Sequence, residues 1–467
     1  MTIDAGFAPD LLRHAGFGDS DISDWIATMR SDTADYDLDV RSYSPVWQRS
    51  YELLARLPPK PARNPDEAQA AAAILAVARD HRERFLAAHV EAVYDRVTEK
   101  RSRFMRVEDI VFEVAAAVPG LAPTPKQVAV EHGRALRDKD GLEIDQGLFL
   151  AHALAGERAG RHLCHAMLLP RPESAELLAK FAREGTLDLG TSILRRSGPA
   201  VHLIMKNPRY LNAEDQTTLD ASEIAVDIAT LDSQSHIAVL RGGEVEHPKY
   251  RGRHVFGSGI NLTHLYRGQI PFVRFLQRDL AFVHKFLRGV ARPDALPDDV
   301  HGTGIEKPWI AAVEGFAIGG HCQILLTMDY VLAASDAYLT LPARKEGIIP
   351  GLANLRLPRF VGDRLARQAI QYERRIDCDS DAGRLICDEI VPPADVGSAI
   401  ERVVDGLTSS GTVSAVGNRR ALRIGQEPLD LFRKYCSAYA RDQAYCHFSP
   451  ALIANLERNW DAKNRTG

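Results

Sequence analysis

Alternation of short apolar runs with helical segments is the feature that most limits how this chain can fold. From Pro199 onward, "AVHLIMKN" and "SHIAVLRGG" read as strands, and the stretch between them places Ile224, Ile228 and Leu231 on one helical face. The same order returns later, where "PWIAAVEGFAIGG" predicts a strand, "HCQILLTMD" a helix and "YVLAASDAYLTLP" further strands. Such alternation indicates an α/β layer architecture.

The chain before and after this region has a different pattern. Up to about residue 195, segments such as "DEAQAAAAILAVARDHRERFLAAHVEAVYDRV" carry Ala, Leu, Glu and Arg at helical spacing and show no strand-like alternation. From about residue 395 the pattern is helical again. Because 467 residues exceed one ordinary core, we expect three domains: an all-helical N-terminal domain over 1–195, an α/β core over 196–395 and a helical C-terminal region over 396–467.

Composition excludes several classes of partner. A formal charge of −4 with 26% charged residues gives no support for nucleic-acid binding, which usually needs a basic face. No apolar run reaches the ~18 residues of a membrane span, and the opening "MTIDAGFAPDLLRHAG" lacks the basic and apolar regions of a secretory signal. Six cysteines without a C-x-x-C pair favour free thiols in a reducing compartment. We therefore expect a cytoplasmic protein with no membrane partner.

No metal site is predicted. His162, Cys164 and His165 lie close together, but on one helical segment, without a fourth ligand or zinc-like spacing around them. We interpret these three residues as part of the helical packing.

Two glycine-rich turns follow apolar strands. They are "FGSGINL" at 256–262 and "GFAIGGHCQ" at 315–323. Glycine lets backbone N–H groups approach a ligand without a Cβ in the way, and the first N–H groups of a helix have no partner inside it. If the two turns converge, their N–H groups would form an oxyanion hole.

These two turns and the later stretch "LPARKEGIIPG" resemble, in order and spacing, the signatures of the crotonase, or enoyl-CoA hydratase/isomerase, superfamily. The resemblance covers about 199–393 and the helical tail, but not the N-terminal helices. It implies a core of repeated ββα units that binds an acyl-coenzyme A thioester and stabilises its enolate. The implied oxyanion donors are the N–H groups of Ile260 and Gly320. It also implies a homo-oligomer, a trimer or hexamer, with C-terminal helices that serve assembly or close the pocket.

The departures from this family are informative. Hydratases of the family carry two Glu residues that handle water and the α-proton, and these positions hold Gln323 and Ala343 here. A glutamine does not exchange protons near neutral pH, and alanine has no polar group. Hydratase chemistry at these positions is therefore excluded, while the enolate-stabilising hole remains.

This combination, together with the N-terminal helices and Asn261 in the first turn, resembles a subgroup of dioxygenases that use neither metal nor organic cofactor. The resemblance implies conversion of 3,5-dihydroxyphenylacetyl-CoA and O2 to 3,5-dihydroxyphenylglyoxylate and free coenzyme A, in the supply of dihydroxyphenylglycine for glycopeptide-antibiotic biosynthesis. Two alternatives stay open. One is another crotonase-type reaction on an aromatic acyl-CoA, by an isomerase, hydrolase or dehalogenase. The other is a non-catalytic acyl-CoA-binding subunit.

Polar residues near the motifs are candidates for contacts with the reacting acyl group. Gln323 could donate a hydrogen bond to a ring hydroxyl or to oxygen, and Glu214 could accept one from a ring hydroxyl. The general base is left open among Glu214, the phenolate of the substrate itself and a bound oxygen species.

Arginines and the first turn supply the other candidates. Arg274 and Arg278 are four residues apart, on one helix face, and we favour Arg278 for the substrate hydroxyls. Arg344 follows Ala343 and could fill the space of the missing Glu, where its planar group suits a phenol. The remaining candidates for binding the thioester and coenzyme A are Arg209, His247, Lys249, Tyr250, Ser258, Gly259, Asn261, Leu262 and Gly319.

Overall fold

The structure, a computed structural model, describes residues 8–29, 33–295, 304–410 and 413–465. Residues 1–7, which belong to the stretch judged above not to be a signal, lie outside the described residues. The chain packs into two compact units. The first comprises Met1–Leu163, Arg267–Val273 and Ser437–Pro450, and the second comprises Cys164–Tyr266, Arg274–Cys436 and Ala451–Gly467. The three domain boundaries expected from the sequence stay a prediction.

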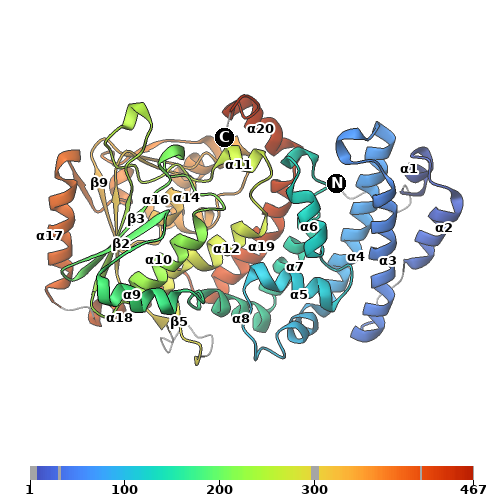
Figure 1. Cartoon of the computed structure of the whole chain (residues 1–467), viewed down its shortest axis with the longest axis horizontal. Coiled ribbons are helices and arrows are strands. Elements are labelled where there is room, and N and C mark those ends of the chain that lie inside the picture. The colour runs from blue at the N-terminus through green and yellow to red at the C-terminus, as the bar shows by residue number, and fades with distance from the viewer. Residues whose placement is uncertain (1–7, 30–32, 296–303, 411–412, 466–467) are drawn as a thin grey trace. The chain divides into compact units, whose positions relative to one another are not determined.

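The first unit is built from helices, and the helical pattern predicted for this part of the chain is confirmed (Figure 1). Four helices contribute residues to both units: α8 (Glu157–Leu168), α12 (Val273–Gln277), α19 (Leu429–His447) and α20 (Pro450–Trp460). The α-helices of the first unit are α1 (Ala8–His14), α2 (Asp19–Thr28), α3 (Tyr36–Arg56), α4 (Pro65–Val97), α5 (Val107–Ala117), α6 (Pro125–His132) and α7 (Glu143–Ala155).

Local sequence explains where the longest helix begins. The side chain of Asn64 accepts a hydrogen bond from the N–H of Glu67, and the Glu67 carboxylate accepts one from the N–H of Asn64, which is a capping box. Pro65 occupies the first helical position, where its missing N–H costs nothing. α4 packs against α3 and α1, and Ile74 of α4 lies in one buried core with Leu53 of α3 and Trp25 of α2.

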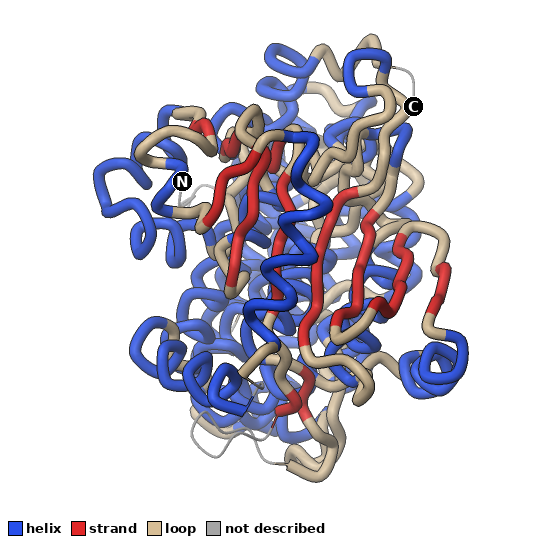
Figure 2. The backbone as a smooth tube through the Cα atoms, turned by 90° about the vertical axis from the view of Figure 1, so that its left-hand side faces the viewer, coloured by secondary structure: helices blue, strands red, loops and turns tan. Residues whose placement is uncertain are grey.

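The second unit is centred on a seven-stranded sheet in the order β1-β2-β3-β4-β7-β9-β12. Its first three strands pair antiparallel, and those from β3 to β12 pair parallel. Figure 2 shows these strands side by side, with a helix across the face of the sheet. The strands are β1 (Thr186–Asp188), β2 (Ser192–Ser197), β3 (Ala200–Met205), β4 (Ile237–Gly242), β7 (Trp309–Val313), β9 (Tyr330–Ala334) and β12 (Glu389–Val391).

Helices cover both faces of this sheet, so the predicted α/β architecture is confirmed (Figure 1). α10 packs on β2 and β3, and α17 packs on β4 and β9. Parallel strands buried on both faces read as continuous apolar runs, and all five residues of β7 are buried. The helices are α9 (Ser174–Glu184), α10 (Leu219–Leu231), α11 (Leu262–Tyr266), α12 (Val273–Gln277), α13 (Val283–Arg288), α14 (Gly320–Leu325), α15 (Ala343–Glu346), α16 (Ala353–Tyr372), α17 (Val396–Thr408), α18 (Val413–Gln426) and α20 (Pro450–Trp460). Among the described residues, no helix is long and apolar enough to cross a membrane.

A smaller sheet carries the second glycine-rich turn. It has the order β11-β10-β8, and β8 leads directly into α14. Its strands are β8 (Phe316–Ile318), β10 (Tyr338–Thr340) and β11 (Ile376–Asp377), and a separate two-stranded sheet joins β5 (Val290–Ala291) to β6 (Gly304–Ile305).

The structure corrects three local predictions. The region before residue 195, expected to be wholly helical, contains β1 and the start of β2, which are stabilised by pairing with β3 and are too short for periodicity to reveal. The single strand expected over 308–320 is split into β7 and β8, because Gly315 turns the chain at φ +67°. The helix expected over 273–290 is interrupted by a π-helical segment, η5 (Arg278–Phe282).

Candidate active site

The structure brings the two glycine-rich turns together. On one side of the first turn, Gly257 pairs in parallel with Ala317 of β8. On its other side Ile260 pairs with Glu214: the N–H of Glu214 donates to the Gly259 carbonyl at 2.7 Å, and the N–H of Asn261 donates to the Glu214 carbonyl at 2.8 Å. The first turn is therefore held between Glu214 and the strand that leads into the second turn.

Two backbone N–H groups remain unused at this junction. Neither the N–H of Ile260 nor that of Gly320 donates to another described residue. Gly320 begins α14, and Gly319 before it has φ +53°, which suits glycine. A Cβ on Gly259 would lie 2.9 Å from the Ile318 carbonyl oxygen and 3.3 Å from the Gly320 nitrogen. The two donors predicted for an oxyanion hole thus belong to turns in direct contact.

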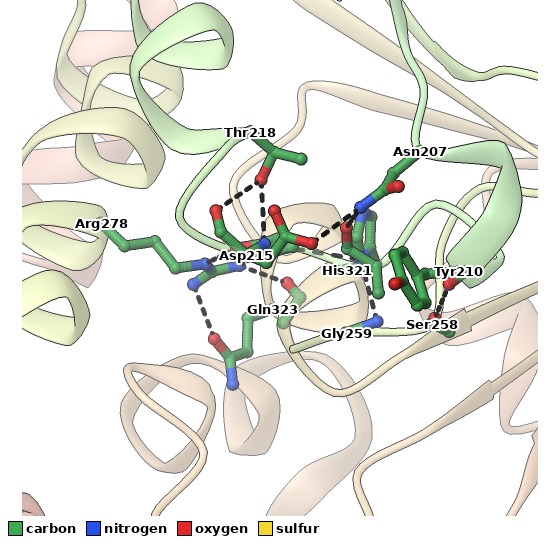
Figure 3. Close-up of polar contacts among 12 residues, drawn as sticks. Asn207, Tyr210, Asp215, Thr218, Ser258, Gly259, Arg278, His321 and Gln323 are labelled. Atoms are coloured by element: carbon green, nitrogen blue, oxygen red, sulfur yellow. Dashed lines mark hydrogen bonds and ion pairs between the residues drawn. The ribbon is translucent and has the colours of Figure 1, made fainter. Parts of the chain in front are cut away.

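Arg278 joins three parts of the site (Figure 3). Its Nε donates to Glu214 Oε2, and its Nη2 donates to Glu214 Oε1 at 2.9 Å and to the Gly320 carbonyl at 2.7 Å. Its Nη1 donates to Gln323 Oε1 and to Asp279 Oδ1, each at 2.9 Å. Arg278 is the first residue of η5, and π-helical turns inside α-helices frequently mark functional sites.

This guanidinium controls the charge of Glu214. Burial alone would raise the Glu214 pKa, but the charge and hydrogen bonds of Arg278 outweigh burial, and the pKa falls to about 2. Burial disfavours the Arg278 cation, but Glu214 and Asp279 raise its pKa. At neutral pH Arg278 is therefore a cation between two carboxylates, and Glu214 is a weak base.

Arg278 also fixes how Gln323 is oriented. A guanidinium can only donate hydrogen bonds, so the Gln323 oxygen must be the atom that faces it. The Gln323 Nε2 donates to no other described residue, and Figure 3 shows it pointing away from Arg278. The position that carries an acid in hydratases here presents an amide donor.

His321 connects the second turn to the first. Its Nδ1 accepts a hydrogen bond from the N–H of Gly259 at 3.0 Å, so the ring is neutral with its proton on Nε2 (Figure 3). Burial lowers the pKa of His321 to about 4. The nearby Glu214 carboxylate raises this pKa, and the Arg278 cation lowers it and offsets part of the effect of Glu214. The neutral imidazole therefore holds the Ser258–Gly259 peptide, one residue before the N–H of Ile260.

We expect a His321→Ala variant to be less stable than the native chain at pH 7, because a buried N–H without an acceptor costs about 1–3 kcal/mol. The difference in the free energy of unfolding between the native chain and His321→Ala should become smaller as the pH falls. The pKa of His321 is lower in the folded than in the unfolded chain, so its unfolded form binds a proton first, and the native chain loses stability between about pH 6.5 and pH 4. Urea unfolding at several pH values measures this, and a difference that grows toward pH 4 would contradict it.

A cavity of about 770 Å³ opens beside the first turn. Ile260, Phe316 and Ile318 form part of its apolar wall. The tail of the chain contributes Trp460 and Arg465, whose guanidinium lies 3.7 Å from the centre of the Trp460 ring.

Most of the residues predicted to bind the thioester and coenzyme A line this cavity. The lining includes Arg209, His247, Tyr250, Ser258, Ile260, Asn261 and Leu262. Asn261 is also engaged structurally, since its Oδ1 accepts from the His264 N–H and its Nδ2 donates to Asp215. The exposed Lys249 lies outside the lining, 5.2 Å from the Tyr250 ring centre.

The prediction that Arg344 fills the space of the missing Glu at position 343 is wrong. Its side chain is exposed, lies 6.0 Å from the ring centre of Tyr372 and does not line the cavity. The reason is the course of α15, a single helical turn in which Ala343 is buried and Arg344 faces outward. Glu346, which the motif analysis passed over, does line the cavity. Its place three residues after Ala343, on the same helical face, was the available signal.

Across the described part of the chain, no group of three or more His, Cys, Asp or Glu residues is arranged to hold a metal ion. None of the six cysteines forms a disulfide, and five of them are buried.

Comparison with known proteins identifies the family. The model of the enoyl-CoA hydratase/isomerase family matches residues 294–424. Over 420 residues the chain is 44% identical to (3,5-dihydroxyphenyl)acetyl-CoA 1,2-dioxygenase of Amycolatopsis orientalis, and the match covers 90% of this chain and 95% of that relative. The chain belongs to the enoyl-CoA hydratase/isomerase superfamily. The resemblance expected from the motifs, to the crotonase superfamily and to its dioxygenase subgroup, is confirmed.

More distant relatives match just over half of the chain. A short-chain-enoyl-CoA hydratase of Clostridium acetobutylicum is 24% identical over 52% of this chain and 84% of its own length. A solved enoyl-CoA hydratase of Mycobacterium avium subsp. paratuberculosis is 19% identical with a TM-score of 0.47, covering 58% of this chain and 98% of that one. The family model begins at residue 294, after the first glycine-rich turn, and that turn contacts β8, which lies within the matched range.

Proposed function

We propose that this chain is a dioxygenase that converts 3,5-dihydroxyphenylacetyl-CoA and O2 to 3,5-dihydroxyphenylglyoxylate and free coenzyme A. The observation that carries the proposal is its 44% identity to the Amycolatopsis dioxygenase over 95% of that relative. The site supports it, because the motif positions of the two hydratase acids hold Gln323 and Ala343, and two unused N–H groups lie in touching turns.

The first chemical stage is formation of a thioester enolate. The substrate Cα lies between an aromatic ring and a thioester, so its carbanion is delocalised into both. The N–H groups of Ile260 and Gly320 hold the thioester oxygen as negative charge develops on it, and each such donor is worth about 10²–10³ in rate. The free Nε2 of Gln323 donates to a ring hydroxyl, and Arg278 fixes the direction of this donor.

The second stage consumes O2 without a metal or organic cofactor. The electron-rich enolate transfers an electron to O2, and recombination forms a C–O bond at Cα. The terminal peroxide oxygen attacks the thioester carbonyl and expels the coenzyme A thiolate. Cleavage of the O–O bond with loss of the second Cα proton leaves a ketone at Cα and a carboxylate. Both oxygen atoms of O2 enter the product, so no external reductant is needed.

The cavity accommodates the coenzyme A part of the substrate. Arg209 and Arg465 provide positive charge for phosphates, and Tyr250 and Trp460 provide aromatic surface for adenine. We further propose a cytoplasmic homo-oligomer, a trimer or hexamer. The cysteines of this chain form no disulfide, which suits a reducing compartment.

Oxygen consumption tests the proposal and separates it from the alternatives. With 3,5-dihydroxyphenylacetyl-CoA in air, we expect O2 uptake and coenzyme A release in a 1:1 ratio, with both ¹⁸O atoms of ¹⁸O2 in the product. Without O2, turnover should stop. Release of coenzyme A without oxygen would indicate a hydrolase, and binding without any release would indicate a non-catalytic subunit. Metal analysis and chelation by EDTA of the active protein test independence from metals.

A further inference from the structure

We propose that Glu346 is the general base that takes the Cα proton of the acyl-CoA substrate. This inference rests on the proposed function and names the catalytic residue that the motifs leave unidentified.

The location of Glu346 is the first argument. It lines the same cavity as Ile260, whose N–H is one of the two proposed oxyanion donors. Among the described residues that line this cavity, Glu346 is the single carboxylic acid. A base for the Cα proton must lie near the proposed oxyanion donors, and of the acids Glu214 and Glu346, Glu346 lines the cavity that Ile260 lines.

The position of Glu346 in the helix is the second argument. α15 is one turn, and Glu346 follows Ala343 by three residues, so the two side chains are neighbours on the same face. Ala343 is where hydratases of this family carry an acid. Compared with those hydratases, the carboxyl group of this chain lies one helical turn later, at Glu346, whose side chain lines the cavity.

The freedom of the Glu346 carboxylate is the third argument. It forms no hydrogen bond or ion pair with another described residue, whereas both oxygens of Glu214 are bound by Arg278. The groups around Glu346 come from three elements: Lys345 on α15, Glu373 at the end of α16, and the neutral Asn455 and Asn459 of α20. A half-buried acid without a partner is available for proton transfer.

The pKa of Glu346 suits a general base. Burial raises the pKa of Glu346 to about 7, with a further rise from Glu373 that Lys345 partly offsets. A base with a pKa near the working pH combines a useful ionised fraction with a strong affinity for the proton. Glu214, with a pKa of about 2, lacks that affinity.

The step is balanced within the site. The Cα–H bond breaks, its electron pair enters the enolate, and the proton forms an O–H bond on Glu346. The protonated Glu346 then returns its proton to the departing coenzyme A thiolate or to solvent, which restores the base.

A Glu346→Gln variant tests the assignment by exchange of the Cα protons in D2O without oxygen, followed by NMR. The native chain should exchange them, and Glu346→Gln should be slowed by about 10²–10⁴-fold. Its affinity for 3,5-dihydroxybenzoyl-CoA, which has no Cα proton, should change less than about threefold. This binding measurement also shows that the variant is folded. Native exchange with unchanged exchange in Glu346→Gln would overturn the inference and leave the dioxygenase proposal standing. A native chain that forms no product with O2 would refute the proposed function instead.

A Glu373→Gln variant is the matched control. Glu373 does not line the cavity, and its charge raises the pKa of Glu346. Removing that charge should move the rising limb of the kcat/KM pH profile to lower pH and leave the plateau at high pH unchanged. In Glu346→Gln the limb near pH 7 should be absent. If the rising limb of the kcat/KM pH profile stays at the same pH in Glu373→Gln, the assignment of Glu346 as the general base is contradicted.

Discussion

A Gly259→Ala variant is expected to lose about 10²–10³-fold in kcat/KM, the loss seen when an oxyanion donor is removed. A Cβ at this position would lie 2.9 Å from the Ile318 carbonyl oxygen, a backbone atom that cannot rotate away. The residue also has φ +81°, which adds strain for alanine. The two turns must therefore separate, and the N–H groups of Ile260 and Gly320, the proposed oxyanion donors, should move apart.

Steady-state kinetics with the dihydroxyphenyl substrate measure this loss, and anaerobic Cα exchange shows whether it lies in enolate formation. Gly417→Ala is a suitable control, because Gly417 lies within α18 and a Cβ there would meet no atom within 4 Å. This control should retain full activity. A Gly259→Ala variant with native kcat/KM would mean that the contact between the turns does not position the donors.

An Arg278→Met variant is expected to lose about 3–5 kcal/mol of stability, the usual result of leaving one partner of a buried ion pair uncompensated. Glu214 would keep its burial but lose both hydrogen bonds from the guanidinium. Activity should fall strongly as well, since Gln323 and the Gly320 carbonyl lose the donor that holds them.

The double variant Arg278→Met with Glu214→Gln separates these two effects. Removing the orphaned charge should restore most of the stability, measured by urea unfolding, but not the activity. The stability difference between Arg278→Met and the native chain should also shrink from pH 7 toward pH 4. In the variant, burial without the Arg278 cation raises the pKa of Glu214, so this carboxylate is neutralised as the pH falls and its burial costs less. In the native fold the Glu214 pKa is about 2, so its contribution is lost only below about pH 4.5. A double variant as unstable as the single one would show that the charge of Glu214 is not the cause.

Much of the fold could be predicted because its signals are local. Parallel strands buried on both faces are continuous apolar runs, as in β4 and β7, and the helices between them carry an apolar face. Weak local signals led to errors. β1 is three residues long and depends on pairing with β2, and the π-helical segment at Arg278 leaves no pattern in the sequence.

The sequence by itself determined the family, the two turns and the loss of both hydratase acids, because glycines at tight turns and the residues Gln323 and Ala343 are visible one position at a time. Only the tertiary structure decided what the charged residues do. Arg278 is bound to Glu214, 64 residues away. Arg344 and Glu346 lie in one helical turn, but Glu346 lines the cavity and Arg344 does not. Charge depends on burial and on partners distant in sequence, so the pKa values of Glu214 and Glu346 separate only in the folded chain.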